Sequence, residues 1–111
     1  MIDNYTWIIY IVCVKFAWDP DKDRMNRKKH GVAFEEAMTV FYDSEALLIS
    51  DPDHSDDEDR FIILGLSSKL KELVVSFCER VKEANEETIR IISARKADKT
   101  EREEYLQKRK L

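Results

Sequence analysis

Apolar and polar residues alternate in the second half of the chain with the period of two that is typical of strands with one buried face. Three such segments occur, and the last of them is rich in β-branched Ile. Polar residues at 68–71 and 82–87 separate the segments and predict two turns. Two shorter apolar runs nearer the N-terminus predict two more short strands. The five predicted strands cover residues 14–18, 47–50, 60–67, 72–81 and 88–95.

A helix is predicted directly after the first strand. Asp19 is a preferred N-cap residue, and Pro20 fits the first helical position because that position needs no N–H. The helix should run through Lys29 or His30. It should end at Gly31, which adopts the left-handed conformation of a helix C-terminus without strain.

Two further helices complete the prediction. The apolar residues of segment 34–41 fall on one helical face. Segment 98–110 is charged, with Tyr105 and Leu106 as its main apolar residues, so we expect a helix that packs only loosely on the domain. The order of elements predicts an α+β domain with an antiparallel sheet. We expect the helices to cover one face of the sheet and to leave the other free for a partner or a substrate.

Composition limits the class of function. The 111 residues suit a single domain, and the net charge of −4 argues against a general nucleic-acid binder, which is usually basic. The charge is unevenly spread, however: residues 22–30 are basic, 51–59 are acidic, and basic residues return over 90–102. A local basic surface is therefore expected. Cys13 and Cys78 do not form a disulfide framework and are expected to be reduced.

Three motifs occur in a fixed order along the chain. They are Arg27-Lys28-Lys29-His30-Gly31-Val32-Ala33-Phe34-Glu35-Glu36-Ala37, then Asp51-Pro52-Asp53-His54-Ser55, then Ile89-Arg90-Ile91-Ile92-Ser93-Ala94-Arg95-Lys96-Ala97. Together they resemble the BrnT family of ribonuclease toxins from type II toxin–antitoxin systems. The resemblance covers residues 14–108, and its most specific parts are the Lys-His-Gly-Val and Ser-Ala-Arg-Lys-Ala blocks.

This resemblance implies a RelE-like fold: an antiparallel sheet with two N-terminal helices packed on it and a C-terminal helix. It implies a cytoplasmic ribonuclease toxin that cleaves RNA without a metal or another cofactor and so inhibits translation. The expected partner is a BrnA-like antitoxin in a toxin–antitoxin heterotetramer. DNA would be contacted only through the antitoxin, and no membrane is involved.

Residues 1–13 precede the family-like pattern. Their apolar run is too short to span a membrane and lacks the features of a signal peptide. Two interpretations are open: an additional strand, or an extension that is not native, with Val14 as the true first residue because a valine codon can start translation in bacteria. We therefore divide the chain into an N-terminal extension, 1–13, and a toxin-like domain, 14–111.

Strand alternation helps to select site residues. Arg80 and Arg90 should lie on the open face, and Phe77 should point into the core. Strict alternation places Arg95 on the face opposite Arg90, whereas a bulge near the strand end would place Arg95 on the same face as Arg90. Arginine suits the phosphate charge that grows during RNA cleavage, and His or Tyr suits proton transfer. The candidate catalytic residues are Arg80, Arg90, Arg95, His30 and Tyr105, and the candidate RNA-binding residues are Arg60, Lys29 and Lys96.

Each candidate has a structural alternative. Arg90 can pair with Glu79 across the strands, Lys29 and His30 can complement the helix dipole, and Tyr105 can anchor its helix. The acidic segment around His54 lacks the Gly and the distant Glu of a calcium loop, so we expect a solvated loop and no metal, although a metal-dependent phosphoesterase is a further alternative.

Phe77 departs from the family pattern, because many members carry His at this strand position. This departure and the acidic net charge keep a second function open: a catalytically inactive, toxin-derived module that only binds its antitoxin.

Overall fold

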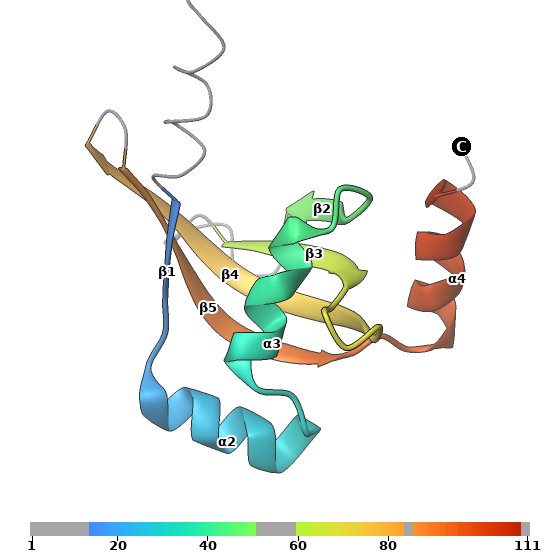
Figure 1. Ribbon diagram of the computed structural model, residues 1–111, viewed down its shortest axis with the longest axis horizontal. Coiled ribbons are helices and arrows are strands. Elements are labelled where there is room, and N and C mark those ends of the chain that lie inside the picture. The colour runs from blue at the N-terminus through green and yellow to red at the C-terminus, as the bar shows by residue number, and fades with distance from the viewer. Residues whose placement is uncertain (1–13, 51–59, 84–85, 110–111) are drawn as a thin grey trace, which may run out of the picture.

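Five strands form a single sheet in the part of the chain that the computed structural model describes, which comprises residues 14–50, 60–83 and 86–109 (Figure 1). The strand order is β1-β5-β4-β3-β2. The strands are β1 (Val14–Ala17), β2 (Leu47–Ser50), β3 (Arg60–Leu66), β4 (Glu72–Glu83) and β5 (Glu86–Lys96), and the helices are α2 (Pro20–His30), α3 (Phe34–Thr39), the 3-10 turn η1 (Val40–Tyr42) and α4 (Lys99–Arg109). None of these helices is long and apolar enough to cross a membrane.

The predicted α+β class is confirmed, with one correction to the sheet. Strands β2, β3, β4 and β5 pair antiparallel in turn, but β1 pairs parallel to β5. After β1 the chain passes through α2, α3 and three strands before β5 returns beside β1. Strand β5 then runs in the same direction as β1. The sheet is therefore mostly, rather than wholly, antiparallel.

The boundaries of α2 follow the local signals in the sequence. The Asp21 N–H donates to the Asp19 carboxylate at 2.9 Å, as expected of an N-cap. At the other end Gly31 has φ +71°, and its N–H donates to the Arg27 carbonyl oxygen at 2.9 Å. The start at Pro20 and the end at Gly31 are thus both confirmed.

The predicted polar turn over 82–87 is wrong. Strand β4 extends to Glu83 and β5 begins at Glu86, so the hairpin is longer than the apolar pattern indicated. Backbone pairing in an antiparallel ladder needs no apolar side chain, and charged residues are tolerated where a strand projects into solvent. The composition of this segment therefore gave a false turn signal.

The main core lies between one face of the sheet and α3 with the segments that flank it. Its fully buried members include Val32, Phe34, Ala37 and Val40 from the helical side, and it takes the alternate residues of β3, β4 and β5. Phe77 is 4% exposed, as predicted for a core residue. Its ring lies 4.9 Å from the Phe41 ring and 5.7 Å from the Phe61 ring, between centroids.

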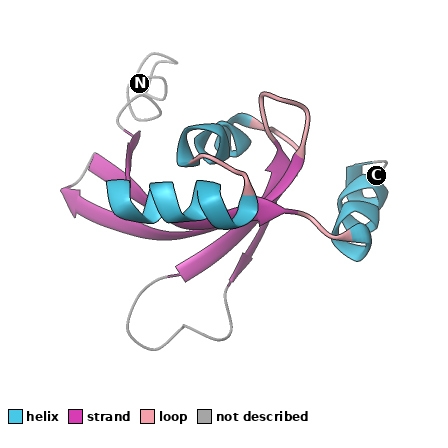
Figure 2. Cartoon of the chain, turned by 90° about the horizontal axis from the view of Figure 1, so that it is seen from below, coloured by secondary structure: helices cyan, strands magenta, loops and turns pink. Residues whose placement is uncertain are grey.

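Helix α4 packs on the other face of the sheet, against a second, smaller cluster. Leu64 and Val74 point away from the main core and meet Ala97 and Tyr105, which is 1% exposed. The Tyr105 hydroxyl donates to Asp43 Oδ2 at 2.5 Å. The expectation that all helices cover one face is therefore wrong: α4 lies apart from α2 and α3, at the end of the sheet (Figure 2). One buried aromatic side chain, Tyr105, anchors this otherwise charged helix.

Asn26 hydrogen-bonds the free edge of β5 beyond the end of β1. Strand β1 pairs with β5 only as far as Arg90, so the rest of β5 lacks a strand partner on this side among the described residues. The Asn26 carboxamide donates to the Ala94 carbonyl oxygen at 2.8 Å and accepts from the Ala94 N–H at 3.1 Å. It also donates to the Val32 carbonyl oxygen at 2.8 Å. One buried side chain thus joins α2, the segment after it and β5.

Replacing Asn26 should destabilise the fold more than its small size suggests. Asn26→Ala leaves buried backbone groups of Ala94 and Val32 without partners, so we expect a loss of about 2–4 kcal/mol in the free energy of unfolding, measured by urea denaturation. Asn26→Asp keeps the shape but turns the donor into a carboxylate that faces two carbonyl oxygens, and it should be at least as damaging. A loss below about 0.5 kcal/mol in both variants, as for an ordinary surface substitution, would contradict this role.

Candidate functional site

Two arginines flank Cys78 on the face of the sheet that α2 and α3 do not cover, here called the outer face. Arg60 pairs in register with Cys78, and Cys78 pairs with Arg90. Neighbouring strands are about 4.8 Å apart, which puts the two arginine backbones roughly 10 Å apart. The Arg90 side chain is exposed and forms no ion pair within the described residues. Its predicted alternative partner, Glu79, lies opposite Ile89 instead.

A β-bulge decides where Arg95 lies. Phe77 pairs with Ile91 whereas Ser76 pairs with Ser93, so Ile92 has no partner in β4. Beyond this point strict alternation fails: Ala94 joins the main core, and Arg95 pairs with Val74 on the outer face. The bulge that sequence analysis allowed for is therefore present.

The Arg95 side chain is occupied at the start of α4. Its guanidinium donates to both carboxylate oxygens of Glu101, at 2.8 and 2.9 Å. Glu101 also accepts from the Asp98 N–H at 2.9 Å, while the Asp98 carboxylate accepts from the Glu101 N–H at 2.8 Å. This reciprocal pair is a capping box. Arg95 thus extends the box and ties the end of β5 to the first turn of α4.

The charge of Arg95 shifts the titration of Glu101. The hydrogen bond from Arg95 is the main reason that the pKa of Glu101 lies below its ordinary value of 4.5. Partial burial opposes this shift, and the hydrogen bonds with Asp98 support it. The carboxylate form of Glu101 is therefore favoured in the folded protein.

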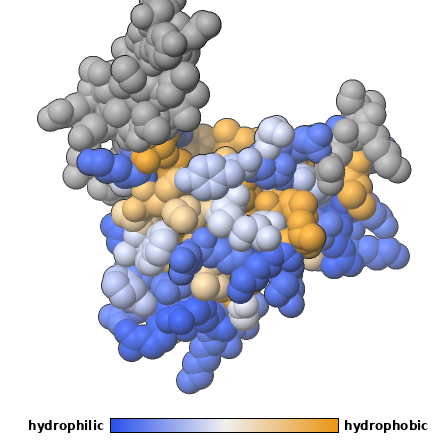
Figure 3. Space-filling view, in the orientation of Figure 1, coloured by the Kyte–Doolittle hydropathy of each residue, from blue (hydrophilic) through white to orange (hydrophobic). Residues whose placement is uncertain are grey.

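A groove of about 580 Å³ lies between α2 and β5. We call it the α2–β5 groove. His30 and Lys29, both predicted as site residues, lie on its helical wall, and Ser93 lies on its strand wall. The part of the molecule around α2 is mainly hydrophilic on the surface (Figure 3). The residues that line the groove are Lys22, Met25, Asn26, Lys28, Lys29, His30, Ile92 and Ser93.

The groove adjoins the outer face. Ser93 pairs with Ser76 on that face, and Arg90 precedes Ser93 by three residues on the same strand. The strand rises by about 3.3 Å per residue, so Arg90 lies roughly 10 Å or less from the groove wall. The structure thus brings His30 and Lys29 together in the groove, with Arg90 three residues along β5 from its strand wall and Arg60 two strands away from Arg90.

The remaining predicted residues lie elsewhere. Tyr105 is buried on the side of α4 that faces the sheet. Lys96 lines a smaller cavity of about 190 Å³ together with Lys71 and Arg102. Arg80 occupies a position of β4 opposite Thr88, and its side chain is outside the described residues. His54 and its acidic neighbours are outside them too. Within the described ranges no three His, Cys, Asp or Glu side chains are placed to hold a metal ion.

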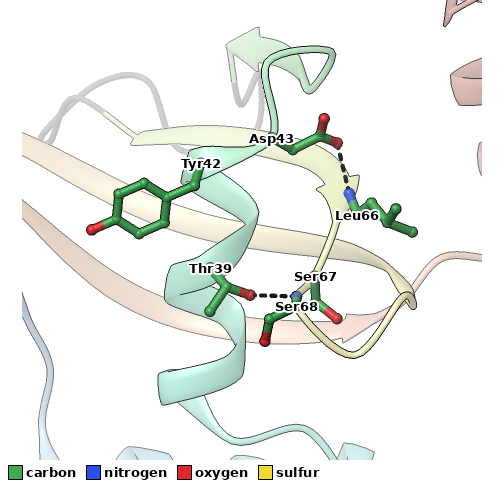
Figure 4. A pocket seen from close by; sticks show the side chains of 6 residues that line it. All are labelled: Thr39, Tyr42, Asp43, Leu66, Ser67 and Ser68. Carbon is green, nitrogen blue, oxygen red and sulfur yellow. Dashed lines mark hydrogen bonds between the residues drawn. The ribbon is translucent and has the colours of Figure 1, made fainter.

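A second cavity, of about 370 Å³, involves residues that sequence analysis did not select (Figure 4). Asp43 Oδ2 accepts from the Leu66 N–H at 2.8 Å, and Thr39 Oγ1 accepts from the Ser68 N–H at 2.9 Å. The polar groups therefore bind backbone and hold α3 and η1 against the turn after β3. The only signal in the sequence was an Asp that follows a helix, which is typical of a local turn.

Comparison with known proteins agrees with this fold. The family model described as "Ribonuclease toxin, BrnT, of type II toxin-antitoxin system" matches residues 18–101. Among solved structures, the crystal structure of the Brucella abortus ribonuclease toxin BrnT is similar, with a TM-score of 0.57 and 24% sequence identity. The similarity covers 78% of this chain and 99% of that one, so the fold is shared. No curated protein matches the sequence.

The Arg95–Glu101 pair makes the stability of α4 depend on pH. Because the pKa of Glu101 is lowered on folding, its ionised form contributes stability that is complete above pH 4.5 and is lost as the pH falls through the pKa of the folded state. Glu101→Gln cannot titrate. We therefore expect this variant to be less stable than the parent at pH 7, with a difference that shrinks below pH 4.5, as thermal denaturation would measure. A difference that stays constant down to pH 3 would exclude this contribution.

Proposed function

Since the chain belongs to the BrnT family of ribonuclease toxins of type II toxin–antitoxin systems, we propose that it cleaves RNA without a metal ion, at the surface formed by Arg90 and the α2–β5 groove. The observation that carries this proposal is the position of Arg90. The Arg90 side chain is exposed, and no ion pair joins it to another described residue. Arg90 stands three residues before Ser93, which lines the groove together with His30 and Lys29.

The chemistry requires few groups. A base removes the proton from the RNA 2′-hydroxyl, whose oxygen attacks the adjacent phosphorus, and the 5′-oxygen of the next nucleotide leaves with a proton. His30 is our candidate for proton transfer, because imidazole can both accept and donate a proton near neutral pH. Arg90 would stabilise the negative charge that develops on the phosphate, since its planar fork matches phosphate oxygens. Lys29 and Arg60 would bind the neighbouring phosphates.

Arg95 and Tyr105 fit a positioning role better than contact with RNA. Arg95 is held by Glu101, and the Tyr105 hydroxyl is held by Asp43. Tyr105 is buried, so α4 would have to move before its hydroxyl reached a substrate. The Arg95 side chain is 44% exposed, but a phosphate would have to compete with Glu101 for its guanidinium. Both would instead fix the end of β5 and α4, and through β5 the position of Arg90. Arg80 remains a candidate for phosphate binding from the neighbouring strand, and Lys96 remains one for RNA binding.

The alternative of an inactive module that only binds an antitoxin rested on the acidic net charge and on Phe77. This residue points into the main core, where it contacts the rings of Phe41 and Phe61. A histidine at the same position would lie among those rings and away from Arg90, which is on the opposite face. The departure at Phe77 therefore does not remove a group from the proposed site, and this favours the ribonuclease.

The proposed partner is a BrnA-like antitoxin that joins two toxin copies in a heterotetramer and contributes the DNA-binding part. We propose that it inhibits the toxin by covering the outer face around Arg60 and Arg90. Acidic groups on the antitoxin would meet these arginines, which would make association faster at low salt.

Cleavage assays on purified protein test the proposed site. Arg90→Ala should lower the rate constant about 100-fold, because a donor to the developing phosphate charge is lost. His30→Ala should lower it by a similar factor. Lys69→Ala, which removes an exposed cation from the turn after β3, serves as the control and should keep the parent rate. The parent enzyme should also keep its rate in excess EDTA. Full activity in both site variants would reject the site, and loss of activity in EDTA that a divalent ion restores would reject metal independence.

Co-expression with the product of the neighbouring gene tests the partner. We expect the two proteins to co-purify, with a mass by light scattering that fits two copies of each. Arg90→Glu in the toxin should weaken the complex, whereas Lys69→Glu, with the same change in charge, should not. A neighbouring product that neither co-purifies nor restores growth would exclude it as the antitoxin.

A further inference from the structure

The helical wall of the α2–β5 groove carries more than the predicted site residues. Lys22, Met25 and Lys29 are spaced by three and four positions, so they lie along one face of α2. Met25 is 71% exposed. Opposite them, Ile92 and Ser93 form the strand wall at the β-bulge, where β5 has neither β1 nor a pairing residue of β4 beside Ile92. The groove therefore combines cations with exposed apolar surface.

The groove cations are not neutralised from within the helix. The two acidic residues of the first turn bind other cations: Asp21 pairs with Arg24, and Asp23 pairs with Arg27. Among the described residues, none forms an ion pair with Lys22 or Lys29. This leaves a concentration of positive charge on the face that borders the groove, despite the acidic total of the chain.

Lys22 is not placed where a cation stabilises the helix dipole. Cations in the last turn of a helix, such as Lys29, stabilise the negative end of the dipole. Lys22 lies in the first turn of α2, at the positive end, where a cation is unfavourable. A bound anion would offset this cost.

The apolar part of the groove indicates what accompanies the anion. Met25 and Ile92 present polarisable and aliphatic atoms, and lysine stems add methylene groups below their charged ends. A volume of about 580 Å³ falls within the range of small-ligand sites, roughly 300–1,000 Å³. A flat base with its attached phosphates suits such a lining. Bases are available for insertion only in single strands, because a duplex keeps them stacked and paired.

We propose that the α2–β5 groove binds one nucleotide of single-stranded RNA next to the bond that is cleaved. Lys22 and Lys29 contact its flanking phosphates, and the base lies against Met25 and Ile92. This subsite rests on the proposed function, since Arg90 stands on the adjoining face of β5. The groove then selects the unpaired part of an RNA and presents the neighbouring phosphate to Arg90.

Binding can be measured without cleavage. A fluorescein-labelled 2′-O-methyl RNA of about ten nucleotides lacks the attacking hydroxyl and leaves every protein side chain in place. Its affinity for the full chain would be followed by anisotropy over a range of salt concentrations. Lys22→Ala and Lys29→Ala should each lower the slope of log affinity against log salt by roughly 0.7. Met25→Ala should weaken binding about two- to tenfold with the slope unchanged. Lys69→Ala should change neither quantity.

Duplex RNA of the same length gives a second comparison. Met25→Ala should leave its affinity unchanged, because no base can enter the groove. Parent-like affinity and salt slope for the single strand in Lys22→Ala, Lys29→Ala and Met25→Ala would overturn the subsite, even if Arg90→Ala abolishes cleavage. If these variants lose affinity for the antitoxin alone, the groove belongs to the protein interface and the subsite is again overturned. If the three groove variants bind RNA more weakly but Arg90→Ala cleaves at the parent rate, the nucleotide subsite in the groove is retained and the proposed role of Arg90 is rejected.

Discussion

The arrangement of this domain depends on the carboxamide of Asn26. It hydrogen-bonds both backbone groups of Ala94 in the way that a neighbouring strand would, and it also holds the segment after α2. A buried edge of a sheet needs such partners, since unsatisfied backbone groups are costly. This contact fixes the distance between α2 and β5 at Asn26, and it helps to hold the two walls of the α2–β5 groove opposite each other. A single uncharged side chain therefore positions the cations of the helix against the strand.

Local signals in the sequence were sufficient to place the elements, except between β4 and β5, where the polar composition of 82–87 gave a false turn. The ends of α2 are set by Asp19, Pro20 and Gly31, which act through their own backbone preferences, and the strand alternation located the buried side of β4. Non-local features were not predictable in this way. The parallel pairing of β1 depends on how the rest of the chain folds, and the place of α4 depends on the fit of Tyr105 against Leu64 and Val74.

The same difference between local and non-local features applies to the candidate site. Arg90 was placed correctly on the outer face because the strand period holds up to Ile91. The position of Arg95 could not be fixed, because a bulge exchanges the faces of every later residue and no residue type marks it. The structural role of Asn26 was not predicted, because nothing in the sequence marks a polar residue on a charged helix as buried. The neighbourhood of His30, Lys29 and Ser93 likewise appears only when residues far apart in sequence are brought together.

The hydrogen bond between Tyr105 and Asp43 has a consequence for cooperativity. The two apolar clusters lie on opposite faces of the sheet, and each alone is small. Asp43 follows η1, which packs into the main core, while Tyr105 belongs to the cluster under α4. The carboxylate of Asp43 also binds the backbone at the end of β3. Detaching α4 would leave this charge without its hydroxyl donor and expose the smaller cluster. Helix α4 should therefore open together with the sheet instead of fraying by itself, and its slowest amide protons should exchange with solvent only when the whole domain unfolds.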